Sequence, residues 1–364
     1  MAVGLPLKTT YANGDVYSAS DVNDTNGTVN LFTSSTLSMA AAKNCLINGA
    51  FDVWQRGTSV SIPASSGAFY STDRYASNTS TNQACTVSRQ ATSDTTNLPF
   101  IRYCARFQRN SGQTGTGGSI GLFQSVETAN SIPFAGRAVT FSFYARAGAN
   151  FSAASSLLSA AVFTGTGTDQ QILAGFTGSA TPIAINATLT TTWQRFTGTA
   201  TLSSSATQIA IQLAYLPVGT AGANDYFEAT GLQIELGATA TTFSRAGGTI
   251  QGELAACQRY YQRFGGNAAY QSLAVGNVAN STTVNGFVFT PVPLRTNPSS
   301  VDFSTLIWQD AGGGLLSISG VTLSNTGNQC IFVTGTISGG SVQRPGQWLA
   351  NNSLSAYLGF SAEL

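Results

Sequence analysis

Few side chains in this 364-residue protein could do acid–base or metal chemistry. It has no His, which excludes Ser-His-Asp and Cys-His catalytic sets and His-ligated zinc, copper or haem. Its five Cys, at positions 45, 85, 104, 257 and 330, are widely spaced and form no CxxC pair. We therefore expect small buried thiols in a protein assembled in a reducing compartment.

Carboxylates offer the remaining route to catalysis. Five Glu and ten Asp would allow the pair of acids that a glycosidase needs. The regularly spaced strands of a β-helix, which usually accompany glycan-cleaving tailspikes, are absent from the sequence pattern. The sequence thus favours a protein that is not an enzyme.

The composition describes an ordered protein with very little charge. Only 9% of residues are charged, against roughly 25% in an average soluble protein. The net charge is +1 and the basic residues are scattered singly, so we expect no nucleic-acid partner. Apolar runs are too short to span a membrane, and residues 1–30 lack the pattern of a cleaved signal peptide. We therefore expect neither membrane insertion nor export by such a signal.

Strict alternation of apolar and polar residues predicts many antiparallel strands. The segment 139–146 places Val139, Phe141 and Phe143 on one face, with Tyr144 and Arg146 on the other. Similar patterns occur at 101–107, 120–126, 193–202, 209–215 and 226–236, the last with an expected kink near Gly231. These strands predict an all-β fold with a central sandwich or jelly roll of about 200 residues.

The remaining segments complete the predicted organisation. A helix is expected at 250–264, capped by Thr249, with Leu254, Cys257, Tyr261 and Phe264 on one stripe. Later strands at 284–294, 301–308, 315–323, 329–337 and 356–360 predict a smaller C-terminal β-sandwich. We therefore expect a docking tail at 1–42, a jelly roll at 43–248, a helical spacer at 249–265 and a tip domain at 266–364.

Several phrases resemble bacteriophage tail-fibre proteins that carry a jelly roll like that of carbohydrate-binding modules. They are NCLINGAFDVWQRGT (44–58), YSTDRY (70–75), VTFSFYAR (139–146), TWQRFT (192–197), YFEATGLQIELG (226–237) and CQRYYQ (257–262). Together they cover roughly residues 44–264. YANGDVYSASDVN (11–23) also resembles the opening of phage minor structural proteins, where it attaches to the virion. The last 100 residues match no family in this way.

The resemblance implies a virion appendage that binds a host-surface glycan without cleaving it. It further implies a homotrimer, made in the host cytoplasm and held to other virion proteins through residues 1–42. The alternative is a structural capsid decoration or baseplate fibre that binds no glycan.

Glycan binding needs flat aromatic faces and side chains that hydrogen-bond to hydroxyl groups. Trp54 and Trp193 belong to the recurrent phrases of the family, and we expect them to be structural. The candidate binding residues are Tyr144, Arg146, Trp308, Arg344, Gln347 and Trp348.

The resemblance also implies a structural Ca²⁺ between the first and last strands of the jelly roll. Calcium prefers six to eight oxygen ligands. The candidate ligands are Asn48, Asp52, Asn224, Asp225 and Glu228. No other cofactor is expected.

Overall fold

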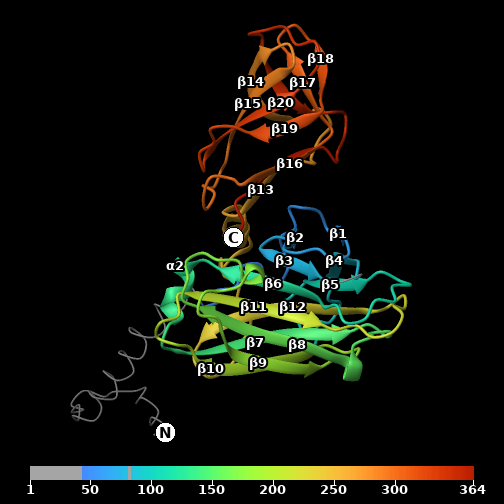
Figure 1. The fold of residues 1–364 in the computed structure, drawn as a ribbon, viewed down its shortest axis with the longest axis vertical. Helices are drawn as coiled ribbons and strands as arrows, with labels where there is room; N and C mark the ends of the chain where they lie inside the picture. The colour runs from blue at the N-terminus through green and yellow to red at the C-terminus, as the bar shows by residue number, and fades with distance from the viewer. Residues whose placement is uncertain (1–42, 81–82) are drawn as a thin grey trace, which may run out of the picture. The chain divides into compact units, whose positions relative to one another are not determined.

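The computed structural model describes residues 43–80 and 83–364 of the chain, and the predicted docking tail at 1–42 lies outside them. The described chain is nearly all β, which confirms the predicted fold class (Figure 1). Residues from Asn44 to Leu364 form one compact unit. That unit contains two large hydrophobic cores, one among residues 46–234 and one among residues 273–362, and a smaller cluster around Trp193.

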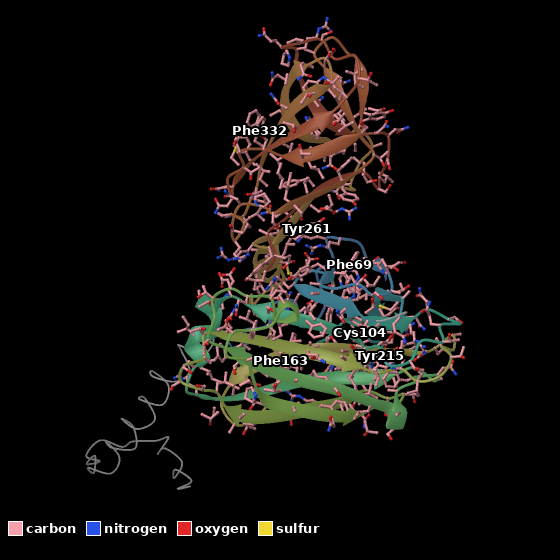
Figure 2. All side chains as sticks on the ribbon, viewed as in Figure 1. Phe69, Cys104, Phe163, Tyr215, Tyr261 and Phe332 are labelled. Carbon is pink, nitrogen blue, oxygen red and sulfur yellow. The ribbon has the colours of Figure 1, made fainter. Side chains whose placement is uncertain are left out.

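The first core lies between two six-stranded antiparallel sheets, and this sandwich has the predicted jelly-roll character. In spatial order the first sheet contains β1 (Ser59–Ile62), β4 (Cys85–Ala91), β5 (Tyr103–Arg109), β12 (Tyr226–Leu236), β7 (Ala138–Ala147) and β10 (Gln194–Thr201). The second contains β2 (Phe69–Thr72), β3 (Tyr75–Thr79), β6 (Ile120–Val126), β11 (Gln208–Tyr215), β8 (Leu157–Gly165) and β9 (Ala180–Thr188). Tyr215, labelled in Figure 2, is part of the buried core.

The alternation predicted for β7 is confirmed. Val139, Phe141 and Phe143 are fully buried, whereas Tyr144 and Arg146 are partly exposed. The predicted kink in β12 is also present, as a bulge where the pairing with β7 shifts between Thr230 and Gln233. Gly231 lies in this bulge with a φ of 62°, a left-handed conformation that suits glycine.

The predicted helix is shorter than expected. Helix α3 spans Ile250–Gln258, and the side chain of Thr249 caps it by accepting a hydrogen bond from the Gly252 amide at 3.1 Å. The chain then forms β13 (Tyr261–Gly265), which pairs with β22 (Tyr357–Ser361). The extension of the helix to residue 264 was therefore wrong, because the backbone from Tyr261 onward hydrogen-bonds to a strand far along the chain. Leu254, assigned to the buried stripe, is exposed.

The second core lies between a three-stranded and a seven-stranded sheet, coloured orange to red in Figure 1. The three-stranded sheet contains β13, β22 and β16 (Ser300–Ser304). The seven-stranded sheet contains β18 (Leu315–Ile318), β17 (Leu306–Asp310), β21 (Pro345–Ala350), β14 (Ser272–Asn280), β15 (Thr283–Phe289), β20 (Cys330–Thr336) and β19 (Gly320–Leu323). The expected strands at 301–308 and 315–323 are each two strands, the first broken at Thr305, which has a φ of 55°.

The other helical segments are single turns. They are α2 (Thr128–Ser131), η2 (Ile132–Phe134), η3 (Ala154–Ser156) and η4 (Ile172–Ala174). Among the residues that the structure describes, no helix has the length and hydrophobicity needed to cross a membrane.

Candidate ligand-binding sites

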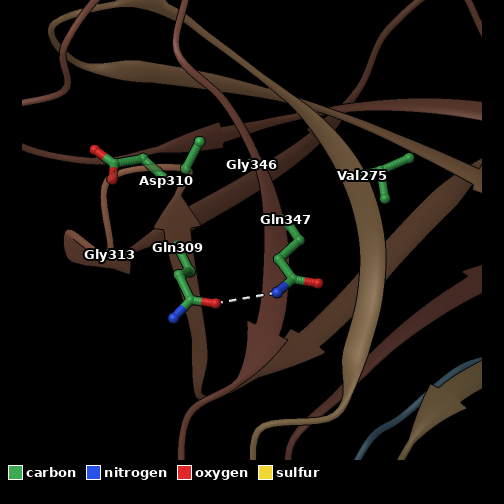
Figure 3. Close-up of a pocket in the computed structure, with 7 residues that line it drawn as sticks. Val275, Gln309, Asp310, Gly313, Gly346 and Gln347 are labelled. Carbon is green, nitrogen blue, oxygen red and sulfur yellow. Dashed lines mark hydrogen bonds between the residues drawn. The ribbon is translucent and has the colours of Figure 1, made fainter.

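A hollow of about 470 Å³ opens on the seven-stranded sheet (Figure 3). It is shallow and open to solvent. Its walls come from β14, β17, β21 and the turn after β17. The lining residues are Val275, Gln309, Asp310, Ala311, Gly313, Gly346 and Gln347.

Strand register brings the central side chains of the hollow together. Gln347 on β21 pairs with Gln309 on one side and with Val275 on the other. Gln347 Nε2 donates to Gln309 Oε1 at 3.0 Å, drawn as a dashed line in Figure 3. A Cβ at Gly346 would collide with the carbonyl oxygen of Gln309, so glycine is needed for this close strand contact. No hydrogen bond within the described chain uses Gln309 Nε2 or Gln347 Oε1, and both stay available to a ligand.

One carboxylate lies at the edge of the hollow. Asp310 Oδ1 accepts hydrogen bonds from the Gly312 and Gly314 amides at 2.8 and 2.9 Å, which fix the tight turn after β17. Arg344 Nη1 donates to Asp310 Oδ2 at 3.0 Å. The Gly314 amide and the Arg344 guanidinium lower the pKa of Asp310. The carboxylate is therefore ionised at neutral pH and acts as a hydrogen-bond acceptor.

The predicted tip residues divide between surface and core. Gln347 lines the hollow. Arg344 forms an ion pair with Asp310, which also lines it. The assignment of Trp308 and Trp348 to a ligand surface was wrong, because both are completely buried in the second core. Side chains alternate along β21, so an outward Gln347 requires an inward Trp348. Trp348 Nε1 donates to the carbonyl of Asn285 at 3.0 Å, a structural role.

Sequence reasoning missed the other polar residues of the hollow. Gln309 was not singled out, because its importance depends on a strand pairing with Gln347. Asp310 did carry a signal in the sequence, since Asp followed closely by several Gly is typical of a tight turn. A turn alone, however, does not indicate a ligand.

The two candidates from the jelly roll lie on the outer face of its first sheet. Register places Arg106, Glu228 and Arg146 side by side on β5, β12 and β7. Arg106 Nε donates to Glu228 Oε1 at 2.8 Å, and Arg146 Nε donates to Glu228 Oε2 at 2.6 Å. Glu228 is completely buried, whereas about a quarter of each arginine side chain is exposed.

Guanidinium groups occupy the aromatic faces around these residues. Arg146 Cζ lies 4.9 Å from the centre of the Trp193 ring, and Arg195 Cζ lies 5.4 Å from that of Tyr144. Trp193 is buried, as expected for a structural residue, and so is Trp54. The ring faces of Trp193 and Tyr144 thus pack against cations, which favours a role in stabilising the sheet.

The candidate calcium ligands do not form one site. Asp52 pairs with Arg245 at 2.7 Å, and Asp225 pairs with Arg109 at 3.3 Å. The Gly49 carbonyl of the first segment bonds to the Leu232 amide, seven residues beyond Asp225 along the chain. At ~3.3 Å per strand residue, Asp225 lies roughly 20 Å and Glu228 roughly 13 Å from this bond.

The other proposed ligands are also engaged. Asn48 bonds to Val53 through both its amide oxygen and its amide nitrogen. The Asn224 backbone amide donates to Asn150 Oδ1 at 3.1 Å. No cluster of three or more His, Cys, Asp or Glu side chains suited to a metal occurs in residues 43–80 and 83–364. The residues predicted from the resemblance therefore do not fit a calcium site.

No protein-family model matches the chain, and no curated protein matches it in sequence. Several solved structures resemble it in part. TmCBM61 in complex with β-1,4-galactotriose is 14% identical, with 54% of this chain and 100% of that chain covered and a TM-score of 0.31. A CBM22-1 xylan-binding domain from Paenibacillus barcinonensis is also 14% identical, with 55% and 98% covered and a TM-score of 0.31.

A third similar structure is the enzymatically active domain of bacteriophage CBA120 tailspike protein 4. It is 14% identical, with 53% of this chain but only 21% of that chain covered and a TM-score of 0.34. The solved structures that resemble the chain thus include carbohydrate-binding modules and a tailspike domain, all at low identity. The similarity is too low for their ligands or activity to be transferred to this protein.

Proposed function

We propose that this protein is a phage virion fibre that binds a host-surface glycan through the hollow on its seven-stranded sheet and does not cleave it. The observation that carries the proposal is the Gln309–Gln347 pair beside Val275 and the Asp310 carboxylate. Amide groups and a carboxylate can hydrogen-bond to neighbouring hydroxyl groups, and Val275 offers an apolar contact for a sugar C–H face. The phrases shared with tail-fibre proteins support the virion assignment.

The chemistry of the hollow supports binding rather than hydrolysis. Glycosidases need two carboxyl groups, one of them a general acid with a raised pKa. Asp310 is the one carboxylate among the described residues that line the hollow, and its pKa is lowered. It would therefore accept hydrogen bonds but not deliver a proton to a glycosidic oxygen.

The proposal includes a homotrimer attached to the virion through residues 1–42. A shallow site on one chain binds weakly, and several linked copies would raise the apparent affinity by avidity. Light scattering on the purified chain tests the assembly, and a monomeric mass would contradict it.

Glycan-array binding by the full chain tests the proposed site. We expect Gln347→Ala to weaken binding by at least tenfold, because it removes the Oε1 acceptor and also the Nε2 donor that holds Gln309 in place. Gln212→Ala is the matched control, a partly exposed glutamine on β11 of the jelly roll, and it should bind like the wild type. Equal binding by both variants would place the site elsewhere. Absence of glycan binding, together with particles that lose stability when the protein is omitted, would instead support a decoration protein.

A further inference from the structure

Three residues of the hollow belong to a longer row of side chains that crosses six strands of the seven-stranded sheet. Register pairs Leu315 with Gln309, Gln309 with Gln347, Gln347 with Val275, Val275 with Phe287 and Phe287 with Phe332. We call these six residues the sheet row. Neighbouring strands lie about 4.8 Å apart, so the row is roughly 24 Å long.

The apolar members of the sheet row face solvent. The exposed fractions are 54% for Leu315, 55% for Val275 and 40% for Phe287. The Phe287 and Phe332 rings are stacked with centroids 4.9 Å apart (Phe332 is labelled in Figure 2). The opposite face of the same strands supplies the second core, so these side chains are not needed to fill it. Exposed apolar side chains gathered in this way commonly mark a binding surface.

A second row of polar side chains runs beside the first. Asn285 Nδ2 donates to Asn277 Oδ1 at 3.2 Å, and the hydroxyls of Thr322 and Thr334 lie 2.7 Å apart. Asn285 and Thr334 are paired across β15 and β20. We call these four residues the amide–hydroxyl row. Neither row contains an ionisable side chain. The charged pair Asp310–Arg344 lies at the hollow.

We propose that the ligand is an extended neutral glycan of several sugars, lying along the sheet row and passing through the hollow. This inference rests on the proposed glycan binding and adds the class and length of the ligand. A sugar ring presents an apolar C–H face and an edge of hydroxyl groups, which match the sheet row and the amide–hydroxyl row respectively.

The chemistry of the two rows also decides between ligands. An acidic glycan would meet one cation, Arg344, which Asp310 already neutralises. A second copy of the chain would bury the amide and hydroxyl groups, each of which costs free energy unless it finds a partner. A glycan supplies those partners from its own hydroxyl groups.

The test is calorimetric titration of the full chain with cello-, xylo-, galacto- and malto-oligosaccharides of one to six sugars. We expect at least one series to gain tenfold or more in affinity between one and six sugars. Phe287→Ala should remove that gain and leave binding of the shortest ligand unchanged. Phe69→Ala, which truncates a similarly exposed phenylalanine on β2 of the jelly roll, is the control and should retain the gain.

The other outcomes separate this inference from the proposed function. A six-sugar ligand that binds no better than one sugar, yet depends on Gln347, would overturn the extended site and leave the hollow as the site. A change of oligomeric mass in Phe287→Ala, with glycan affinity unchanged, would mean that the sheet row joins copies of the chain. Failure of every series and of the glycan array would overturn both proposals.

Discussion

At the scale of single residues, several carboxylates of the described chain are buried and paired with arginine. Asp225 and Arg109 are both completely buried and bonded to each other. Glu228 is equally buried and shares its two oxygens between Arg106 and Arg146. A charge removed from water is stable only when a partner and hydrogen bonds compensate for its lost solvation. These groups therefore fix the relative positions of strands.

Replacing Glu228 with Gln tests this structural role. The uncharged amide leaves Arg106 and Arg146 close together without a counterion. The NH₂ group of the new glutamine would also face an arginine N–H, so that two donors oppose each other. We expect Glu228→Gln to lower the free energy of unfolding by about 2 kcal/mol, measured by urea denaturation. Arg137→Gln is the control, because Arg137 is exposed, and a change below about 0.5 kcal/mol is expected. An equally small effect at Glu228 would refute the structural role.

The five cysteines should differ sharply in reactivity. Burial raises the pKa of Cys45 and of Cys85 to about 12, and it also raises the pKa values of Cys104 and Cys257. Cys330 alone is exposed among the five, and the thiolate is the reactive form. At pH 8 we expect a thiol reagent to modify one cysteine quickly and the other four only after denaturation. Cys330→Ser should abolish the fast phase, and a second fast thiol would contradict the burial.

The sequence placed side chains reliably on one face of a sheet where it predicted the phase of their strand. Arg146 and Tyr144 were placed correctly on the outer face of β7, because the alternation of that strand is unambiguous. Trp348 was placed on the wrong side because β21 was not recognised as a strand. That strand begins with Pro345 and Gly346, which obscure its pattern. Without its phase, the neighbours Gln347 and Trp348 could not be assigned to opposite faces.

At the scale of elements, strands with a pure alternating pattern were predicted well and irregular strands were not. β6 has the bounds expected from the sequence, and β7 extends one residue beyond them at each end. β14 was missed, because its pairing with β21 shifts between Ser272 and Ala274 and this breaks the period of two. The end of α3 was misjudged because Tyr261 and Phe264 fit both a helical stripe and a strand, and the pairing with β22 decides between them.

The bulge in β12 offers a test at this scale. A Cβ at Gly231 would lie 2.8 Å from Ile101 Cδ1 and 2.9 Å from Tyr144 Cδ2, closer than such atoms pack. We expect Gly231→Ala to lower the free energy of unfolding by about 2–3 kcal/mol, from the clash and the positive φ together. Gly219→Ala is the control, since Gly219 has a φ of 67° and open space around it. Gly219→Ala should lower the free energy of unfolding by about 1 kcal/mol, the cost of placing alanine at a positive φ without a clash. Equal losses would mean that the bulge has room for a side chain.

At the scale of the molecule, the end of the chain links the two cores. Glu363 forms ion pairs with Arg74 and Arg56 of the jelly roll, and Tyr70 donates a hydrogen bond to the Leu364 oxygen at 3.0 Å. The Arg74 guanidinium also lies 3.4 Å from the centre of the Tyr260 ring. The Glu363 carboxylate, as the charge partner of Arg74, raises the pKa of that guanidinium against the effect of burial. These contacts make the last residues of the chain part of the jelly roll's surface.

Replacing Glu363 with Gln should therefore affect how the two cores unfold. The change leaves two largely buried guanidinium groups without their counterion, which we expect to lower the stability of the junction by about 3 kcal/mol. Calorimetry of the wild type should show one cooperative transition, and Glu363→Gln should show two, because cores that are no longer coupled unfold separately. Asp169→Asn is the matched control. This substitution removes the charge partner of Arg295. The Asp169–Arg295 pair is longer and more exposed than the pairs of Glu363, so the single transition should remain. A single transition in Glu363→Gln as well would mean that the remaining contacts of the junction, such as the hydrogen bond from Gln55 to the Tyr261 carbonyl, are enough to couple the cores.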